Sequence, residues 1–341
     1  MRNIVLVFAG GAVALLTTAM LLTAGWQAPP IHTAQGGYRG LSMGQLTTAG
    51  SERALAAANT LPDELPPASP DGDRATASYQ NVKVLTDLSA DQFNRVMLAL
   101  NAWVAPQDQG CNYCHNPDNL ADDSPYTKRV SRVMLQMTRA INKDYQTHVG
   151  TTGVTCWTCH RGEPLPKNVW YNEKPPRAAG FAATNYGFGH PSAFNGSTGL
   201  TAEPFSGVLD GQENVRVQAL QVYPAGYGAS IQATEKSYSL MIAMSKGIGV
   251  NCTFCHNAQD FGEWELSTPA RVTAWHGLAM SRDLNTKYLI PLQPEWPANR
   301  LGPMGDGPKV ICATCHQGAS KPLLGVSMAK NWPELYGVNK P

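Results

Sequence analysis

The stretch of sequence that decides the fold covers residues 134–162 and reads MLQMTRAINKDYQTHVGTTGVTCWTCHRG. It ends in a Cys-x-x-Cys-His pentapeptide, Cys156 to His160, which is the attachment sequence of a c-type haem. In such a site the two thiols add to the vinyl groups of the porphyrin, and the histidine ligates the iron from one side. The preceding part has helical character and carries Met134 and His148, which can both ligate a haem iron from the other side.

Every cysteine of the chain belongs to such a pentapeptide. Zinc sites use cysteines in closed sets of four ligands and do not require a histidine after each pair. Four copies that use up all eight cysteines therefore predict four covalently bound c-type haems and leave no cysteine for a disulfide. The predicted haem-attaching cysteines are Cys111, Cys114, Cys156, Cys159, Cys252, Cys255, Cys312 and Cys315. The motif histidines predicted to ligate iron are His115, His160, His256 and His316.

The composition excludes several function classes. The chain has 341 residues, a net charge of +1 and 15% charged residues, so it lacks the basic excess of a nucleic-acid-binding protein. Its 32 glycines and 25 prolines indicate a loop-rich protein. The length allows a large core and two or three domains.

The N-terminus has the pattern of a membrane segment. Arg2 is followed by a run from Ile4 to Trp26 without a charged side chain, long enough to cross a hydrocarbon core at about 1.5 Å per residue. A cleaved signal peptide shares these features, but no small-x-small cleavage site follows the run. We therefore expect an uncleaved transmembrane anchor over residues 1–26, with Arg2 in the cytoplasm and the haem region in the periplasm.

Helix signals recur before the haem motifs. Ser89 and Gln92 have the spacing of a capping box, and apolar residues at helical spacing follow. Ser124-Pro125 and Thr268-Pro269 each predict an N-cap with proline in the first turn. The predicted organisation is a membrane anchor (1–26), an extended arm (27–78), a first two-haem half (79–165), a connecting segment (166–222), a second two-haem half (223–330) and a C-terminal tail (331–341).

The haem region repeats itself. The first and third motifs share Cys-x-aromatic-Cys-His-Asn, and the second and fourth share Cys-x-Thr-Cys-His-x-Gly. Residues 137–142 (MTRAIN) match residues 280–285 (MSRDLN). We therefore expect a mainly α-helical multihaem cytochrome c with long loops, built from a duplicated two-haem unit with pseudo-two-fold symmetry.

The sixth ligand of each iron must come from outside the motifs. Four bis-histidine haems would need all four remaining histidines, including His32 close to the N-terminal segment, so methionine is the better candidate. Met97 and Met241 hold equivalent positions on the helices before the first and third motifs, which favours them as ligands. The alternative is that they only fill the core, as methionine on an apolar helix face usually does.

The second half lacks one of these methionines. When Met137 is aligned with Met280, Gly277 stands opposite Met134. Met134 can therefore ligate the second haem, whereas the fourth haem needs a ligand from elsewhere.

His148 is the best candidate for that vacancy. If the helix continued from Met134 to His148, the two side chains would lie on nearly the same face about 21 Å apart, so they would serve different haems. The rivals for the fourth haem are Met280, which we interpret as packing, and His276. His190 lies in the connecting segment and could equally be a solvent-facing loop residue.

Together these features resemble the tetrahaem cytochrome c subunit of the purple-bacterial photosynthetic reaction centre. The likeness covers residues 79–330 and extends to the sequence after Met134 and to residues 249–257 (GVNCTFCHN). The resemblance implies a mostly α-helical subunit on the periplasmic face of the photosynthetic membrane that re-reduces the photo-oxidised bacteriochlorophyll pair held by the L and M subunits. It implies that the third haem lies nearest that pair and the first haem farthest. The axial ligands implied by the resemblance are Met97, Met134, Met241 and His148.

One feature departs from the family. Many members end their signal peptide at a lipid-modified cysteine, whereas no cysteine precedes Cys111 in this chain. This departure favours a retained helix as the anchor.

The predicted function is electron transfer without an enzymatic substrate site, because six-coordinate irons leave no open position. Expected partners are the L and M subunits, the H subunit and light-harvesting ring, the membrane, and a soluble donor, either a cytochrome c or a high-potential iron–sulfur protein; no nucleic acid is expected. Asp118, Asp122 and Asp123 form either a docking patch for a basic cytochrome or an ordinary solvated loop.

Three other functions remain open from the sequence. They are a membrane-anchored tetrahaem quinol dehydrogenase, a multihaem reductase and a freestanding periplasmic electron carrier. The small number of histidines disfavours the quinol dehydrogenase, and a reductase needs a five-coordinate iron.

Overall fold

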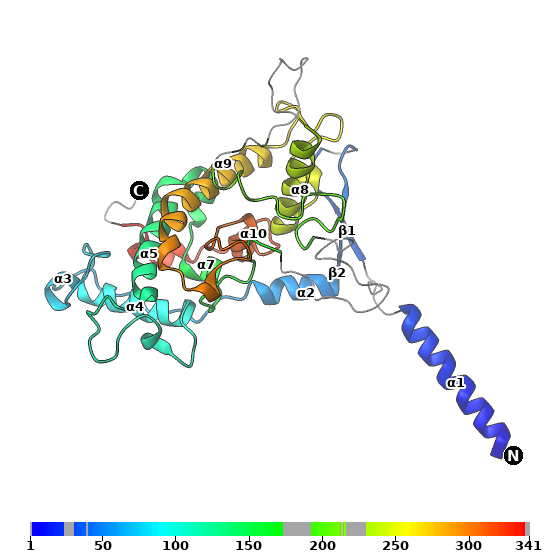
Figure 1. Cartoon of the computed structure of the whole chain (residues 1–341), viewed down its shortest axis with the longest axis horizontal. Coiled ribbons are helices and arrows are strands. Elements are labelled where there is room, and N and C mark those ends of the chain that lie inside the picture. Colours follow the sequence, from blue (N-terminus) through cyan, green and yellow to red (C-terminus); the bar gives the residue numbers. More distant parts are fainter. Residues whose placement is uncertain are drawn as a thin grey trace.

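Helices joined by long loops make up most of the chain. The computed structural model describes residues 2–23, 31–38, 40–172, 192–211, 213, 215 and 230–337, and of residues 2–8 only the backbone. Within these ranges the only sheet is a two-stranded hairpin. Figure 1 shows α7 and α10 in the middle of the molecule, with α4 and α5 on one side and α8 on the other. The mainly α-helical fold predicted from the sequence is confirmed.

The N-terminal helix, α1 (Arg2–Thr23), has 22 residues. Among the described residues, however, no helix is both long and apolar enough to cross a membrane. The prediction of a transmembrane anchor over residues 1–26 is therefore not supported by the structure.

The predicted extended arm contains regular structure. Strands β1 (Ile31–Gln35) and β2 (Gly44–Thr48) form an antiparallel hairpin. Helix α2 (Ala49–Ala58) follows directly, because Thr48 and Ser51 form a capping box at its start. Neither the hairpin nor this helix was predicted from the sequence.

The arm packs on two of the haem motifs. The backbone N–H of Met43 donates to Thr253 Oγ1 (2.8 Å), inside the third motif. The indole Nε1–H of Trp157, inside the second motif, donates to Thr60 O (3.0 Å) just after α2. The arm thus covers part of this chain's own haem region.

The first half begins as predicted. The Ser89 side chain accepts from the Gln92 N–H and the Gln92 side chain accepts from the Ser89 N–H, which confirms the capping box. Pro125 is itself the N-cap of the next long helix, so the predicted N-cap at Ser124 is wrong by one residue. The elements of this half are α3 (Ala75–Ser78), α4 (Ala90–Trp103), η1 (Gly110–Tyr113), α5 (Tyr126–Asp144), α6 (Gln146–Val149), η2 (Gly150–Thr152) and α7 (Cys156–His160).

The helix that carries Met134 does not reach His148. Helix α5 ends at Asp144, and His148 lies on the short helix α6 beyond a break at Tyr145. The Tyr145 hydroxyl donates to Asp283 Oδ2 (2.7 Å), which ties this corner to the second half. The condition under which Met134 and His148 would share one helix face is therefore not met.

The second half repeats the order of the first. Thr268 is the N-cap of α9 and Pro269 opens the helix, as predicted. The elements are α8 (Ile231–Ile248), η3 (Cys252–Phe254), α9 (Pro269–Leu284), the π-helical turn η4 (Asn285–Leu289), η5 (Ile290–Glu295), η6 (Ala298–Arg300), α10 (Cys312–His316), η7 (Pro322–Gly325), η8 (Ala329–Asn331) and η9 (Pro333–Leu335).

The C-terminal segment closes the first half. At the end of α5, Asn142 Nδ2 donates to Val154 O (2.9 Å) and Leu335 O (3.0 Å), and its Oδ1 accepts from the Val154 N–H (2.7 Å). One turn earlier, Arg139 donates from Nε and Nη2 to Glu334 O (3.0 and 2.7 Å). The matching residues of the sequence repeat make the same kind of contact in the second half.

In that half Asn285 Nδ2 donates to Val310 O (3.0 Å) and Leu209 O (3.4 Å), and its Oδ1 accepts from the Val310 N–H (2.7 Å). Arg282 Nε donates to Val208 O (2.5 Å). We call residues 208–209 and 334–335 the closing segments. Residues 208–209 follow the first half but pack on the second, and residues 334–335 follow the second half but pack on the first.

Three apolar clusters fill the interior between these elements. The first contains Val96, Trp103, Leu135, Trp332 and Leu335. The second contains Val130, Ile141, Met280, Leu284 and Val310. The third contains Phe205, Leu209, Leu240, Leu278 and Ile311. Each closing segment contributes a leucine to a cluster, Leu335 to the first and Leu209 to the third, so the core of either half includes residues from outside that half.

Candidate haem-binding site

The second and fourth motifs fold as the short helices α7 and α10. At the start of α7 the Thr158 side chain accepts from the Thr155 N–H (2.9 Å), and in α10 Thr314 accepts from the Ile311 N–H (3.0 Å). The threonine shared by these two motifs therefore caps its own helix and fixes the direction of the following cysteine and histidine.

The first and third motifs fold instead as 3-10 turns, η1 and η3. A threonine at the start of the next long helix holds each turn, because Thr127 Oγ1 donates to Tyr113 O and Thr268 Oγ1 donates to Phe254 O (2.5 Å each). The two motif types of the sequence thus correspond to two local conformations.

The four motif histidines share one hydrogen-bond arrangement. In each, Nδ1 lies at hydrogen-bond distance from a backbone carbonyl, so Nδ1 carries the proton and donates. This tautomer leaves Nε2 free as a metal ligand and fixes the orientation of the ring. The acceptors are Leu120 O for His115 (3.0 Å), Glu163 O for His160 (3.0 Å), Phe261 O for His256 (2.8 Å) and Ala319 O for His316 (2.9 Å).

Burial favours the neutral, iron-binding form of three of the imidazoles, those of His160, His256 and His316. Desolvation lowers the pKa of His160 and His256 below the ordinary value, and it lowers the pKa of His316 to about 4. Desolvation therefore acts in the direction that leaves Nε2 of these three rings unprotonated and able to bind a metal.

His148 has the same arrangement although it belongs to no motif. Its Nδ1 donates to Thr273 O (2.9 Å) on α9. Its ring lies on Gly277, where a Cβ would come within 2.5 Å of His148 Cε1. The imidazole of His148 thus occupies the space that a side chain at position 277 would need.

His148 also faces the histidine of the fourth motif. The ring centroids of His148 and His316 are 6.0 Å apart. Two imidazoles bound to one metal through nitrogens at about 2 Å each would have their ring centres about 6 Å apart. The residues present therefore fit an iron between these two rings.

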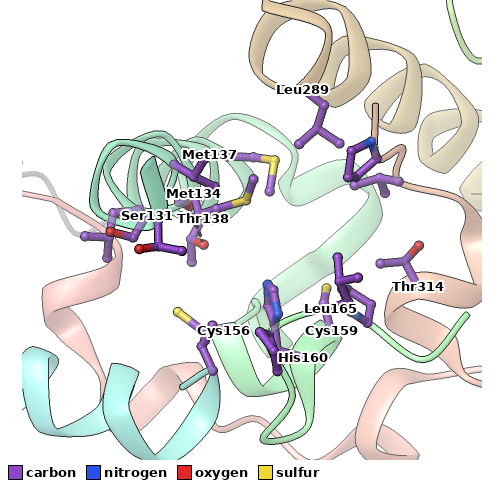
Figure 2. Close-up of a pocket in the computed structure, with 18 of the residues that line it drawn as sticks. Ser131, Met134, Met137, Thr138, Cys156, Cys159, His160, Leu165, Leu289 and Thr314 are labelled. Carbon is purple, nitrogen blue, oxygen red and sulfur yellow. Dashed lines mark hydrogen bonds between the residues drawn. The ribbon is translucent and has the colours of Figure 1, made fainter. Parts of the chain in front are cut away.

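Met134 faces the second motif across a cavity. Figure 2 shows Met134 and Met137 on one side and Cys156, Cys159 and His160 on the other. The cavity, including the open solvent at its mouth, encloses about 1280 Å³ and is lined mainly by apolar side chains. Its apolar wall and its sulfur and imidazole groups fit a covalently held haem.

The other proposed methionine ligands lie on helices next to their motifs. Met97 is on α4, which contacts η1, and Met241 is on α8, which contacts η3. Met280 is only 8% exposed and packs in the second apolar cluster, in agreement with its interpretation as a packing residue.

The remaining histidines lie in other surroundings. His32 Nδ1 pairs with Glu52 Oε1 (2.8 Å) on the exposed arm. The ring of His276 packs edge-on against Trp275 with 5.0 Å between centroids. His190 lies outside the described residues.

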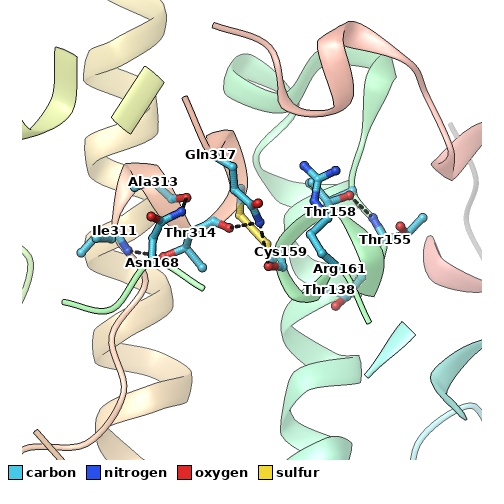
Figure 3. The surroundings of a disulfide bond; sticks show 12 residues. Thr138, Thr155, Thr158, Cys159, Arg161, Asn168, Ile311, Ala313, Thr314 and Gln317 are labelled. Carbon is cyan, nitrogen blue, oxygen red and sulfur yellow. Dashed lines mark hydrogen bonds between the residues drawn. A yellow bond between two sulfur atoms is a disulfide. The ribbon is translucent and has the colours of Figure 1, made fainter. Parts of the chain in front are cut away.

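A disulfide joins the second and fourth motifs. It links Cys159 and Cys315, whose Cα atoms are 4.4 Å apart, and Gln317 Nε2 donates to Cys159 O (3.2 Å) beside it (Figure 3). The prediction that no cysteine forms a disulfide is therefore wrong for this structure. A sulfur atom in a disulfide cannot also form a thioether, so haem attachment at these two positions requires the thiols.

The acidic cluster near the first motif is largely neutralised. Asp123 lies within 3.2 Å of Lys83, Lys128 and Arg132, and hydrogen bonds from Arg132 and then Lys83 hold the pKa of its carboxyl far below the usual range. Asp122 accepts from Ser124, which lowers the pKa of this carboxyl to about 2. These contacts favour a structural loop over an acidic docking patch.

Sequence reasoning missed the residues that hold the backbone around the motifs. Asn142 and Asn285, both 1% exposed or less, link each long helix to a motif and to a closing segment. The sequence did mark these two asparagines, because each is the last residue of the repeated segment (MTRAIN and MSRDLN). The residues that they contact could not be inferred from that repeat.

The fold and the motifs together define a c-type cytochrome. The family model of the photosynthetic reaction centre cytochrome c subunit matches residues 27–336. The photosynthetic reaction center cytochrome c subunit of Rubrivivax gelatinosus is 45% identical over 320 residues, which are 93% of this chain and 87% of the relative. The protein of the same name from Thermochromatium tepidum is 41% identical over 324 residues, 95% of this chain and 80% of the relative. The chain belongs to the family of photosynthetic reaction centre cytochrome c subunits.

Proposed function

We propose that the chain is a four-haem electron-transfer subunit on the periplasmic side of the photosynthetic membrane, where it re-reduces the photo-oxidised bacteriochlorophyll pair of a reaction centre. The observation that carries this proposal is the order of the motifs in space. Along the molecule η1 contacts α4, α4 contacts α7, α7 contacts α10, α10 contacts α8, and α8 contacts η3. The haem motifs thus form one row in the order first, second, fourth, third.

The eight cysteines attach the haems, and each motif histidine supplies one axial ligand. We assign Met97, Met134 and Met241 as the other ligands of the first, second and third haems, because each lies on a helix beside its motif. We assign His148 to the fourth haem, because it faces His316 and shares the hydrogen-bond arrangement of the motif histidines.

A duplicated two-haem unit accounts for this arrangement. The matched contacts of Asn142 and Asn285, and of Thr158 and Thr314, support the inference that both halves descend from one unit. The disulfide position supports a pseudo-two-fold axis near Cys159 and Cys315, where α7 meets α10.

When bound, the haems supply reversible one-electron chemistry. The chain's own residues set the conditions for it. The carbonyls that accept from Nδ1 keep each imidazole in the ligating tautomer. Methionine ligation raises the reduction potential relative to bis-histidine ligation, so we expect three high-potential sites and one low-potential site at His148 and His316.

The expected partners are the L and M subunits, the H subunit and light-harvesting ring, and a soluble donor, either a cytochrome c or a high-potential iron–sulfur protein. The carboxylates of Asp122 and Asp123 already have hydrogen-bond partners within the chain. This argues against an acidic docking site for the soluble electron donor at the first motif. A quinol dehydrogenase is disfavoured, because it depends on histidine-rich ligation and the structure places His32 in an ion pair with Glu52.

Two measurements on the native protein test this function. Intact mass should show four covalently bound haems, and a redox titration should resolve three high-potential haems and one low-potential haem. Fewer than four haems, four bis-histidine potentials, or ready binding of carbon monoxide would contradict the proposal. Reduction by an added quinol would instead favour the quinol dehydrogenase.

A further inference from the structure

A cation from the second half lies in the wall of the cavity that faces the second motif. Arg300, at the end of η6, lines this cavity together with Met134, Cys156 and His160. Its Nη2 donates to the Tyr113 hydroxyl at 3.3 Å. The cavity is mostly apolar, and an acceptor of opposite charge offsets the cost of placing a guanidinium in such a wall.

The carboxylates close to Arg300 in the chain already have partners. Glu295 pairs with Arg129 (2.7 Å). Asp306 pairs with Lys309 and also accepts from Trp170 Nε1 (2.6 Å). Among the described residues no carboxylate lies within 4.0 Å of Arg300, so the protein supplies this cation with hydroxyl oxygen but with no counter-ion.

A second hydrogen-bond donor in the same wall lacks an acceptor. The indole Nε1 of Trp296 is buried and has no hydrogen-bond partner within the described residues. Trp296 lines the cavity with Arg300, four positions further along the chain. A buried N–H without an acceptor is costly, so this indole beside a guanidinium that has no counter-ion among the described residues indicates a missing anionic acceptor.

We propose that Arg300 and Trp296 bind a propionate carboxylate of the haem attached to Cys156 and Cys159. Haem carries two such carboxylates, and a carboxylate matches an unpaired guanidinium in charge and geometry. This assignment rests on the proposed attachment of haem at the second motif. It makes the second half supply the counter-charge of a haem of the first half, as the first half supplies His148 to the fourth haem.

The consequence is a raised reduction potential at the second haem. A cation beside the propionate offsets a negative charge that would otherwise stabilise the oxidised iron. The effect depends on the charge of Arg300 and on its hydrogen bonds, so lysine and glutamine at this position separate the two contributions.

The test is a redox titration of the haem-loaded subunit, free of other reaction-centre subunits, carrying R300Q, R300K or W296F. The R300Q variant should shift the reduction equilibrium of one haem about tenfold toward the oxidised form, which is about 59 mV for one electron. R300K should shift it less, and W296F should give the smallest shift in the same direction. The resonance Raman bending mode of the propionate should change in all three variants.

A methionine variant identifies the affected haem. M134H marks the second haem by a large fall in its potential, and the haem that R300Q shifts should be the same one. K287Q is the matched control, because it removes an equal charge from a residue that is 59% exposed and paired with Asp283.

Mass spectrometry of the wild-type chain and of each variant counts the bound haems and so separates the proposed function from the proposed propionate site. Fewer than four haems in the wild-type chain would contradict the function but not this site. Unchanged potentials in R300Q with four haems bound would overturn the proposal. A shift in the potential of the first haem, to which Met97 is assigned, would also overturn it. A change in potential that occurs only in the complete reaction-centre complex would overturn it too, because the carboxylate would then belong to a partner. If R300Q fails to fold, R300K and W296F decide alone.

Discussion

The two halves of the haem region differ at one pair of positions that the sequence repeat aligns. The first half has Met134 where the second half has Gly277. Met134 faces its own motif, whereas Gly277 leaves a space that His148 of the first half fills. In the proposed assignment, this one difference replaces a local ligand with a ligand from the other half, and it links the fourth haem to the folding of the first half.

Replacing His148 should have the largest effect on this comparison. In H148M the fourth haem changes from bis-histidine to methionine–histidine ligation, and its potential should rise on the order of 100 mV within the roughly 0.8 V that axial ligands span. In H148A its iron should become five-coordinate and bind carbon monoxide. A redox titration and the carbon monoxide difference spectrum measure both changes.

Two further variants sharpen this test. In G277A the new Cβ would lie 2.5 Å from His148 Cε1, so the ring must move and the fourth haem should respond as it does in H148A. H276A is the control, because it removes the neighbouring imidazole and should leave all four potentials in place. If H148A instead alters the spectrum of the second haem, His148 is not the cross-half ligand.

The reciprocal closing segments offer a second comparison, now of stability. N142A and N285A each remove a buried side chain that joins a helix, a motif and a closing segment, and each should lower the free energy of unfolding by about 1–3 kcal/mol. Because the segments cross between halves, hydrogen exchange should increase at residues 334–336 in N142A and at residues 208–211 in N285A.

The exposed Asn94 provides the control for this pair, since N94A removes an amide that bonds only to the Tyr79 hydroxyl in the described part of the chain. Faster exchange at residues 208–211 in N142A would mean that each segment closes its own half, and the crossed arrangement would be wrong.

Local sequence signals predicted the parts of this molecule that act locally. The pentapeptides, the Ser89 capping box and Thr268-Pro269 each depend on residues a few positions apart, and the structure has the capping box and the helix start where they were expected. The absence of a methionine at Gly277 could also be predicted from the sequence, because the repeat aligns this position with Met134.

The parts that could not be predicted depend on contacts between distant residues. Asn142 and Leu335 are 193 positions apart, and their bond ends on a backbone carbonyl that any residue provides. The break at Tyr145 likewise coincides with a contact to Asp283, 138 positions away. No local pattern marks these contacts, so the sequence indicated the repeat but not the crossed closing segments.

The smallest expected effect concerns the residue after the histidine in the second and fourth motifs. Arg161 and Gln317 have nearly the same left-handed backbone conformation, with φ of 54° and 48°. Gln317 is neutral and donates to Cys159 O (3.2 Å). Arg161 donates from Nη2 to Asn59 Oδ1 (3.2 Å), whereas its Nε and Nη1 are buried without a partner among the described residues.

Burial lowers the pKa of Arg161 to about 10, so the side chain still carries its charge at neutral pH. This charge should favour the reduced form of the second haem, and R161Q should lower that potential by up to about 59 mV, a tenfold shift in the equilibrium. Q317R should raise the potential of the fourth haem, because the same backbone conformation already accepts arginine in the second motif. Redox titration of both variants measures the two shifts. Equal shifts of all four haems in R161Q would mean that the charge acts on the whole molecule, and that these equivalent positions do not tune their own haems.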